Sequence, residues 1–194
     1  MGGPPGAHRL SGYSGPHCGS LGAADAGREV ELYGWVARRR DHGGLIFIDL
    51  RDRWGAVQIV FNPTRAAEAH AAASELRAEF VVRAKGTVGR RPAGSENPRM
   101  ATGEVEVTAS ELEVISTAKT PPFQIDDEVE ADEATRLKYR YLDLRRPRMQ
   151  QTLKLRHRVV QTIHRYMDSN DFVEVETPMS VSYTHLTLPT ILRV

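Results

Sequence analysis

One short segment combines an aromatic ring with several positive charges. Over residues 45–51, strand alternation puts Phe47 and Asp49 on one face and the aliphatic residues on the other. Arg38, Arg39 and Arg40 precede it, within a basic, glycine-containing turn. A ring stacks on nucleobases and guanidinium groups contact phosphates, so this pattern favours single-stranded nucleic acid. The same pattern allows a ring covered by a loop and a merely solvated turn.

Five strands and one helix are expected to position these residues. The strands are predicted over 30–37, 45–51, 56–61, 80–88 and 104–109, and an alanine-rich helix over 66–77. The apolar positions shift after Ser110, which indicates a bulge. Gln58 is placed on the same kind of face as Phe47, whereas the alternation does not assign Arg38 and Arg40 to a face. This order of elements is typical of an OB-fold barrel, whose second and third strands bind oligonucleotides.

The remainder of the chain has a different character. Two prolines and a run of acidic residues between positions 117 and 135 indicate a hinge between domains. A short helix is expected near 133–140, and a longer one over 148–169 carries an apolar stripe at helical spacing. Asn170 and Asp171 are expected to close that helix, before a strand over 172–177.

Composition excludes several classes of protein. The net charge of the 194 residues is only +1, so basic character is local rather than global. The single cysteine, Cys18, excludes an internal disulfide and fits a reducing compartment. No apolar run is long enough to span a membrane and no signal-peptide core is evident, so we expect a cytoplasmic protein. No spacing of ligands predicts a metal site.

Several separated motifs resemble one family in the same order. They are Gly34 to Asp52, Pro121-Pro122-Phe123, Arg136 to Pro147 and Phe172 to Met179. Together they resemble the bacterial-type aspartyl-tRNA synthetases, which are class II enzymes, over roughly residues 17–180. The resemblance implies a β-rich α+β chain: a five-stranded OB-fold barrel, a hinge, and the first helix and strand of a class II catalytic domain.

The resemblance also implies an organisation of the chain. The expected parts are a flexible extension (1–16), the anticodon-binding barrel (17–116), a hinge (117–147), the start of the catalytic domain (148–180) and a non-native tail (181–194). Pro178 matches the first class II motif, which builds the homodimer interface. Outside its own domain the apolar stripe of 148–180 would be uncovered, so we expect that region to be poorly packed.

Residues of the anticodon site are implied in the same way. Phe47 matches the aromatic residue that stacks on an anticodon base, and Gln58 matches the partner of the central uridine. Glu106 matches a carboxylate that helps to recognise the anticodon, and Arg38 and Arg40 match arginines around the loop. A second pair, His42 and Gly94, resembles enzymes that accept both tRNA(Asp) and tRNA(Asn).

Catalysis is expected of the longer parent and not of this chain. The parent would activate aspartate with ATP and Mg²⁺ and transfer it to tRNA, using class II motifs that lie beyond residue 194. Three alternatives stay open: an asparaginyl- or lysyl-tRNA synthetase fragment, a free-standing OB-fold module that binds tRNA, and a structural dimerisation fragment.

Overall fold

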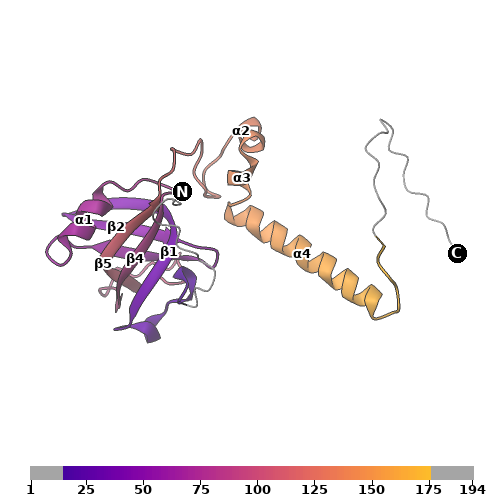
Figure 1. The fold of residues 1–194 in the computed structure, drawn as a ribbon, viewed down its shortest axis with the longest axis horizontal. Coiled ribbons are helices and arrows are strands. Elements are labelled where there is room, and N and C mark those ends of the chain that lie inside the picture. The colour runs from indigo at the N-terminus through magenta and orange to yellow at the C-terminus, as the bar shows by residue number, and fades with distance from the viewer. Residues whose placement is uncertain (1–14, 176–194) are drawn as a thin grey trace, which may run out of the picture. The chain divides into compact units, whose positions relative to one another are not determined.

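A computed structural model describes residues 15–175 (Figure 1). The chain divides into two compact units, Met1–Ile125 and Asp126–Val194. No helix in the described range is both long enough and apolar enough to cross a membrane.

The first unit is a closed barrel of five strands in the order β1-β2-β3-β5-β4. The strands are β1 (Glu29–His42), β2 (Leu45–Arg51), β3 (Ala56–Phe61), β4 (Val81–Arg90) and β5 (Val105–Ser116). All pairings are antiparallel except that of β3 with β5, which is parallel. Two short 3-10 helices, η1 (Cys18–Ser20) and η2 (Ala23–Asp25), precede β1, and the helix α1 (Ala67–Ser74) packs against β2, β3 and β5. The predicted OB-fold order of elements is therefore confirmed.

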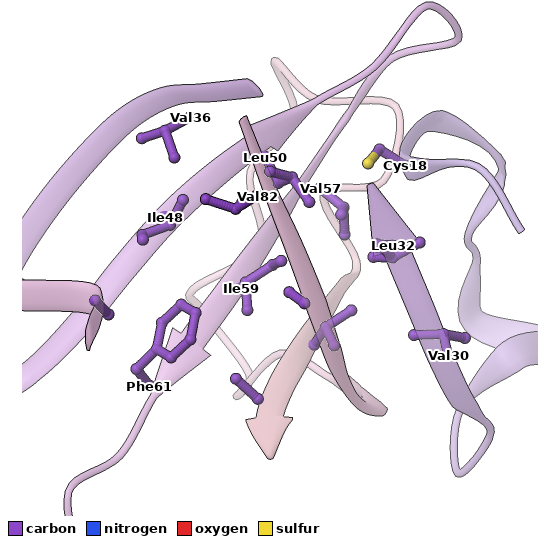
Figure 2. Packing of buried hydrophobic residues seen from close by; sticks show 14 of the residues in the cluster. Cys18, Val30, Leu32, Val36, Ile48, Leu50, Val57, Ile59, Phe61 and Val82 are labelled. Carbon is purple, nitrogen blue, oxygen red and sulfur yellow. The ribbon is translucent and has the colours of Figure 1, made fainter. Parts of the chain in front are cut away.

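The barrel interior is filled by alternate residues of every strand. Figure 2 shows Leu50, Val57 and Ile59 pointing into this interior, with Cys18 of η1 at one end. The most deeply buried large side chains are Leu32, Val36, Ile46, Ile48, Leu50, Val57, Ile59, Phe61, Val82, Val88, Val105 and Val107. The predicted inward face of β2 is thus confirmed, and β3 and β5 bury alternate residues in the same way. Burial of these side chains drives closure of the sheet.

The first strand is longer than predicted. We expected it to end at Ala37 and Arg38 to Arg40 to form a turn, but these arginines lie in β1 and pair with Asp49, Ile48 and Phe47 of β2. The turn itself is only Gly43-Gly44, with φ of +60° and +80°. Two successive positive φ angles define a type I′ hairpin turn, whose twist matches the paired strands and lets the ladder continue to the turn.

Several register shifts and one shortened helix complete the barrel, with one further shift between Val81 and Val82 of β4. The register shifts between Val36 and Arg38 of β1, and β5 carries an extra residue at Ser110 opposite β4, where the sequence predicted a bulge. The helix ends at Ser74 rather than at residue 77. Residues 77–80 leave the helical path because Glu79 has a φ of +66° and its N–H donates to the Val36 carbonyl.

The second unit contains α2 (Glu133–Lys138), α3 (Arg140–Asp143) and α4 (Pro147–Asp168). Asp132 caps α2 by accepting a hydrogen bond from the Thr135 N–H. The Asp143 carboxylate is buried and accepts hydrogen bonds from Arg136 and Arg140. The hydrogen bond from Arg136 first, and then the charges of Arg136, Arg140 and Arg146, lower the pKa of Asp143.

Helix α4 ends as predicted. Asp171 has a φ of +64°, its N–H donates to the Asp168 carbonyl and the Phe172 N–H donates to the Met167 carbonyl. This pair of bonds is a Schellman motif, which satisfies the last carbonyl groups of the helix. The predicted strand over 172–177 is wrong for residues 172–175, which are not in a strand. A strand needs a pairing neighbour, and the elements described in this unit are all helices.

The apolar stripe of α4 is exposed, as expected for this region. Its members are Leu155, Val159, Val160, Ile163, Tyr166 and Met167. Pro178, most of the proposed extension (1–16) and all of the proposed tail (181–194) lie outside the described residues.

Candidate nucleic-acid interface

Four strands bring the predicted site residues to one outer face of the barrel. Arg38 pairs with Asp49 and Arg40 with Phe47 across β1 and β2, and Asp49 pairs with Gln58 across β2 and β3. The bulge after Val36 places the arginines on this face, which the sequence alternation left open. The parallel pairing of Ile59 with Val107 places Gln58 beside Glu106 of β5.

A chain of hydrogen bonds links these side chains. Arg40 Nη2 donates to Asp49 Oδ1 at 2.8 Å and to Gln58 Oε1 at 3.1 Å. Gln58 Nε2 then donates to Glu106 Oε2 at 3.0 Å. A guanidinium only donates and a carboxylate only accepts, so the two neighbours fix the orientation of the Gln58 amide.

The surroundings of Gln58 and Phe47 differ in exposure. Arg40 and Glu106, which bond to Gln58, lie next to it, and only 6% of the Gln58 residue is exposed. Phe47 is half-buried, so part of this residue is accessible, and it lies opposite Arg40 in the strand pairing. A held amide and an accessible ring on neighbouring strands suit edge recognition of one base and stacking on another.

The β1–β2 turn is held by a contact from the helix. His70 of α1 donates a hydrogen bond from Nε2 to the Gly44 carbonyl at 2.9 Å. His42 is exposed at the end of β1, next to this turn. Gly94 lies in the loop between β4 and β5 with a φ of +85°, and its N–H donates to Glu96.

The structure therefore gathers Arg38, Arg40, Phe47, Gln58 and Glu106 on one face. It places His42 and Gly94 on separate segments beyond the hydrogen-bonded chain. Sequence reasoning missed the contributions of Asp49 and His70. Asp49 shares the alternation of Phe47 and could have been found from that signal, whereas nothing in the sequence relates His70 to a turn 26 residues away.

Comparison with known proteins gives two family matches. Residues 30–115 match the OB-fold nucleic acid binding domain, and residues 132–186 match the class II tRNA synthetases (D, K and N).

Curated relatives share more than half of the aligned residues. An aspartate–tRNA(Asp/Asn) ligase from Syntrophotalea carbinolica is 56% identical over 167 residues, which are 86% of this chain and 28% of that protein. The ligase of the same name from Moorella thermoacetica is 56% identical over 174 residues, 90% of this chain and 28% of the relative. The chain thus spans about 28% of the length of these relatives.

Solved structures share the fold. Asparaginyl-tRNA synthetase from Pyrococcus horikoshii, complexed with asparaginyl-adenylate, is 26% identical with a TM-score of 0.72, over 86% of this chain and 37% of that one. Aspartyl-tRNA synthetase from Entamoeba histolytica is 20% identical with a TM-score of 0.77, over 89% and 41%. At 20% identity, the similarity to the Entamoeba histolytica enzyme shows a shared fold only. The barrel, the class II match and the relatives agree that the chain is similar to one part of the class II aspartate–tRNA ligases.

Proposed function

We propose that the outer face of β1, β2, β3 and β5 binds the anticodon loop of a tRNA. The observation that carries this proposal is the hydrogen-bonded chain Arg40–Gln58–Glu106 beside the accessible ring of Phe47. It joins a stacking surface, a positive charge and a fixed amide within one patch. Those groups are what an unpaired RNA loop needs for stacking, phosphate contact and base recognition.

The Gln58 amide fits the edge of a uridine. Its internal bonds use one N–H and one lone pair of its oxygen, which leaves one donor and one acceptor. The Watson–Crick edge of uridine offers an N3–H donor and carbonyl acceptors. Gln58 therefore makes two complementary bonds to the central uridine of an aspartate anticodon, and Glu106 and Arg40 hold the amide in position for both.

The longer protein is an aspartate–tRNA ligase. It activates aspartate with ATP and Mg²⁺, transfers aspartate to tRNA, and works in the cytoplasm as a homodimer to whose interface Pro178 contributes. The relatives' printed name, aspartate–tRNA(Asp/Asn) ligase, supports acceptance of tRNA(Asn) as well as tRNA(Asp), with His42 and Gly94 as the residues that permit it. The present chain binds RNA but does not form the adenylate.

Binding of short RNA hairpins tests the first part. The chain is titrated with an anticodon stem-loop carrying the aspartate anticodon, and with the same loop whose central uridine is replaced by cytidine, at one fixed salt concentration. We expect the first loop to bind about tenfold or more tighter, in line with the loss of one well-formed edge contact. Gln58→Ala should remove this preference, and Phe47→Ala should weaken both loops, since stacking is worth about 1–3 kcal/mol per base.

A matched variant controls for changes unrelated to the site. Gln161→Ala removes the same side chain from the exposed surface of α4 and should leave both affinities unchanged. Equal affinity of the wild-type chain for the two loops would refute recognition of the central base and leave only a generic RNA-binding surface.

Acceptance of tRNA(Asn) needs its own comparison. The aspartate and asparagine anticodons, GUC and GUU, differ only in their third base. We expect the two stem-loops to bind with similar affinity and a His42→Leu variant to favour the aspartate loop. A wild-type chain that already excludes the asparagine loop contradicts this assignment without affecting recognition of the central uridine.

A further inference from the structure

A cavity of about 340 Å³ lies beside the turn between β2 and β3. Its wall includes His17, Tyr33, Trp35, Arg53, Trp54 and Ile115. It is distinct from the anticodon interface. Phe47 lies four residues before the end of β2, so about 13 Å of strand separates it from the start of this turn.

The cavity wall is fixed by one carboxylate. Asp52 Oδ2 accepts a hydrogen bond from the Cys18 N–H at 2.7 Å, and its Oδ1 accepts from the N–H groups of Trp54 and Gly55 at 2.7 and 2.9 Å. Gly19 packs so closely that a Cβ there would lie 2.3 Å from the Trp54 carbonyl oxygen. The segment before β1 and the β2–β3 turn therefore form one rigid unit, as is usual for pre-formed ligand sites.

The chemistry of the wall is aromatic with one cation. The rings of His17 and Trp54 are stacked, with centroids 3.5 Å apart and planes at 10°. The Arg53 guanidinium lies 5.8 Å from the centroid of the Trp54 ring and, within the described residues, forms no ion pair. Trp54 is 58% exposed, although burying an indole is favourable.

We propose that this cavity binds a nucleotide. The base lies in the apolar interior against the rings of Tyr33, Trp35 and Trp54, and the phosphate is bound by Arg53. The Tyr33 hydroxyl donates to Glu31 at 2.6 Å, so the polar end of this wall residue is bound to that carboxylate. Flat aromatic walls beside an available guanidinium match a planar ring that carries a negative charge. An aliphatic peptide side chain would use neither the stacked rings nor the cation.

The chain carries a built-in probe for this site. Trp35 and Trp54 are its two tryptophans, and both line the cavity. Quenching of intrinsic fluorescence, excited at the red edge of tryptophan absorption, therefore reports occupation directly. The titrants are AMP, GMP, CMP and UMP, with adenosine and ribose 5-phosphate as partial ligands.

We expect saturable quenching by at least one nucleotide and none by ribose 5-phosphate. Trp54→Ala, followed through Trp35, should weaken binding roughly 5- to 150-fold, the range for loss of one stacking surface. Trp54→Phe keeps an aromatic wall and should retain most of the affinity, which separates loss of stacking from misfolding. Arg53→Gln should abolish the preference for AMP over adenosine.

Two further comparisons distinguish the sources of the ligand and the two sites. The Phe47→Ala variant, which lacks the stacking ring of the anticodon interface, is titrated with a single-stranded trinucleotide and with its mononucleotides. If the trinucleotide binds about tenfold tighter, the ligand is a base of an RNA chain. Equal affinities identify a free nucleotide. Gln161→Ala, on the exposed surface of α4, should leave mononucleotide binding unchanged. The proposal is overturned if none of the four nucleotides gives saturable quenching, or if Trp54→Ala leaves the quenching unchanged. Saturation of the cavity by an apolar peptide in place of a nucleotide would also overturn it.

Discussion

Replacing Asp49 by Asn tests whether this carboxylate restrains Arg40. The Arg40 guanidinium is bound to Asp49 Oδ1 at 2.8 Å and is shared with the Gln58 amide. The side chain of Arg40 is 43% exposed and that of Asp49 is 17% exposed. A pair that is this open to water contributes below about 1 kcal/mol to stability, so the variant should fold normally.

The effect on RNA binding has two opposite parts. A charge-assisted hydrogen bond is roughly twice as strong as a neutral one, so the uncharged amide of the Asp49→Asn variant holds Arg40 less firmly and the Gln58 amide loses part of its fixed orientation. We expect the preference for the central uridine to fall about five- to tenfold, which corresponds to roughly 1–1.4 kcal/mol. At the same time, Arg40 becomes available to a phosphate, so affinity for a mismatched loop should rise.

Salt dependence separates these two parts. One additional phosphate contact on a single strand steepens the dependence of log K on log salt by about 0.7. The assay is anisotropy of labelled matched and mismatched stem-loops, between about 50 and 200 mM salt. Asp41→Asn is the matched control, because Asp41 carries the same charge on β1 but is 59% exposed and lies 3.8 Å from Arg39. If Asp49→Asn and Asp41→Asn change the affinities and salt slopes equally, the restraint on Arg40 does not exist.

Three further predictions concern the turn, the buried thiol and the end of α4. His70→Ala removes the hydrogen bond to the Gly44 carbonyl, so the free energy of unfolding of the barrel in urea should fall by about 0.5–1.5 kcal/mol and stem-loop binding should weaken. If neither quantity changes, the His70 contact does not support the turn. Burial first, then the nearby Asp52, raises the pKa of Cys18, so only the unfolded chain releases this proton above pH about 8.5. Between about pH 9 and 10, stability should therefore fall by up to about 1.4 kcal/mol per pH unit, and Cys18→Ala should flatten that slope; a slope that persists in the variant assigns it to another group. Asp171→Gly relieves a left-handed conformation and should raise the melting temperature of α4, measured by circular dichroism at 222 nm. Asp168→Gly, at the last residue of the helix, should lower that temperature. A lower melting temperature for Asp171→Gly would contradict the assigned helix end.

Local patterns predicted the strands whose faces differ most in polarity. The bounds of β2 and β3 match the predicted ones, because alternation of aliphatic and polar residues marks both. The bulge at Ser110 followed from a shift of the same alternation. Helix α4 followed from helical spacing, whereas its left-handed end at Asp171 followed from the family resemblance, since Asp is among the residues that tolerate positive φ.

Errors arose where partners distant in sequence decide the structure. Arg38 to Arg40 have no strand-forming pattern, and β1 extends through them because β2 offers a ladder up to the glycine turn. Residues 172–175 have a strand-forming pattern but no pairing neighbour among the described residues. The contact between Gln58 and Glu106 joins positions 48 apart, so the sequence placed both residues without showing that they touch. The cavity beside Trp54 depends on Gly19 and Asp52 in the same way.

The parallel seam between β3 and β5 has a consequence for how the barrel forms. Only two residue pairs, Ile59 with Val107 and Val60 with Thr108, define its register. Hairpins with short connections assemble early, whereas this closure needs a long loop to be ordered first, so it is the late step of folding. Amide hydrogens along the seam should accordingly exchange with solvent through openings smaller than global unfolding. Gln58 and Glu106 are bonded across the same seam, so we expect a base bound to the Gln58 amide to slow the opening of the barrel.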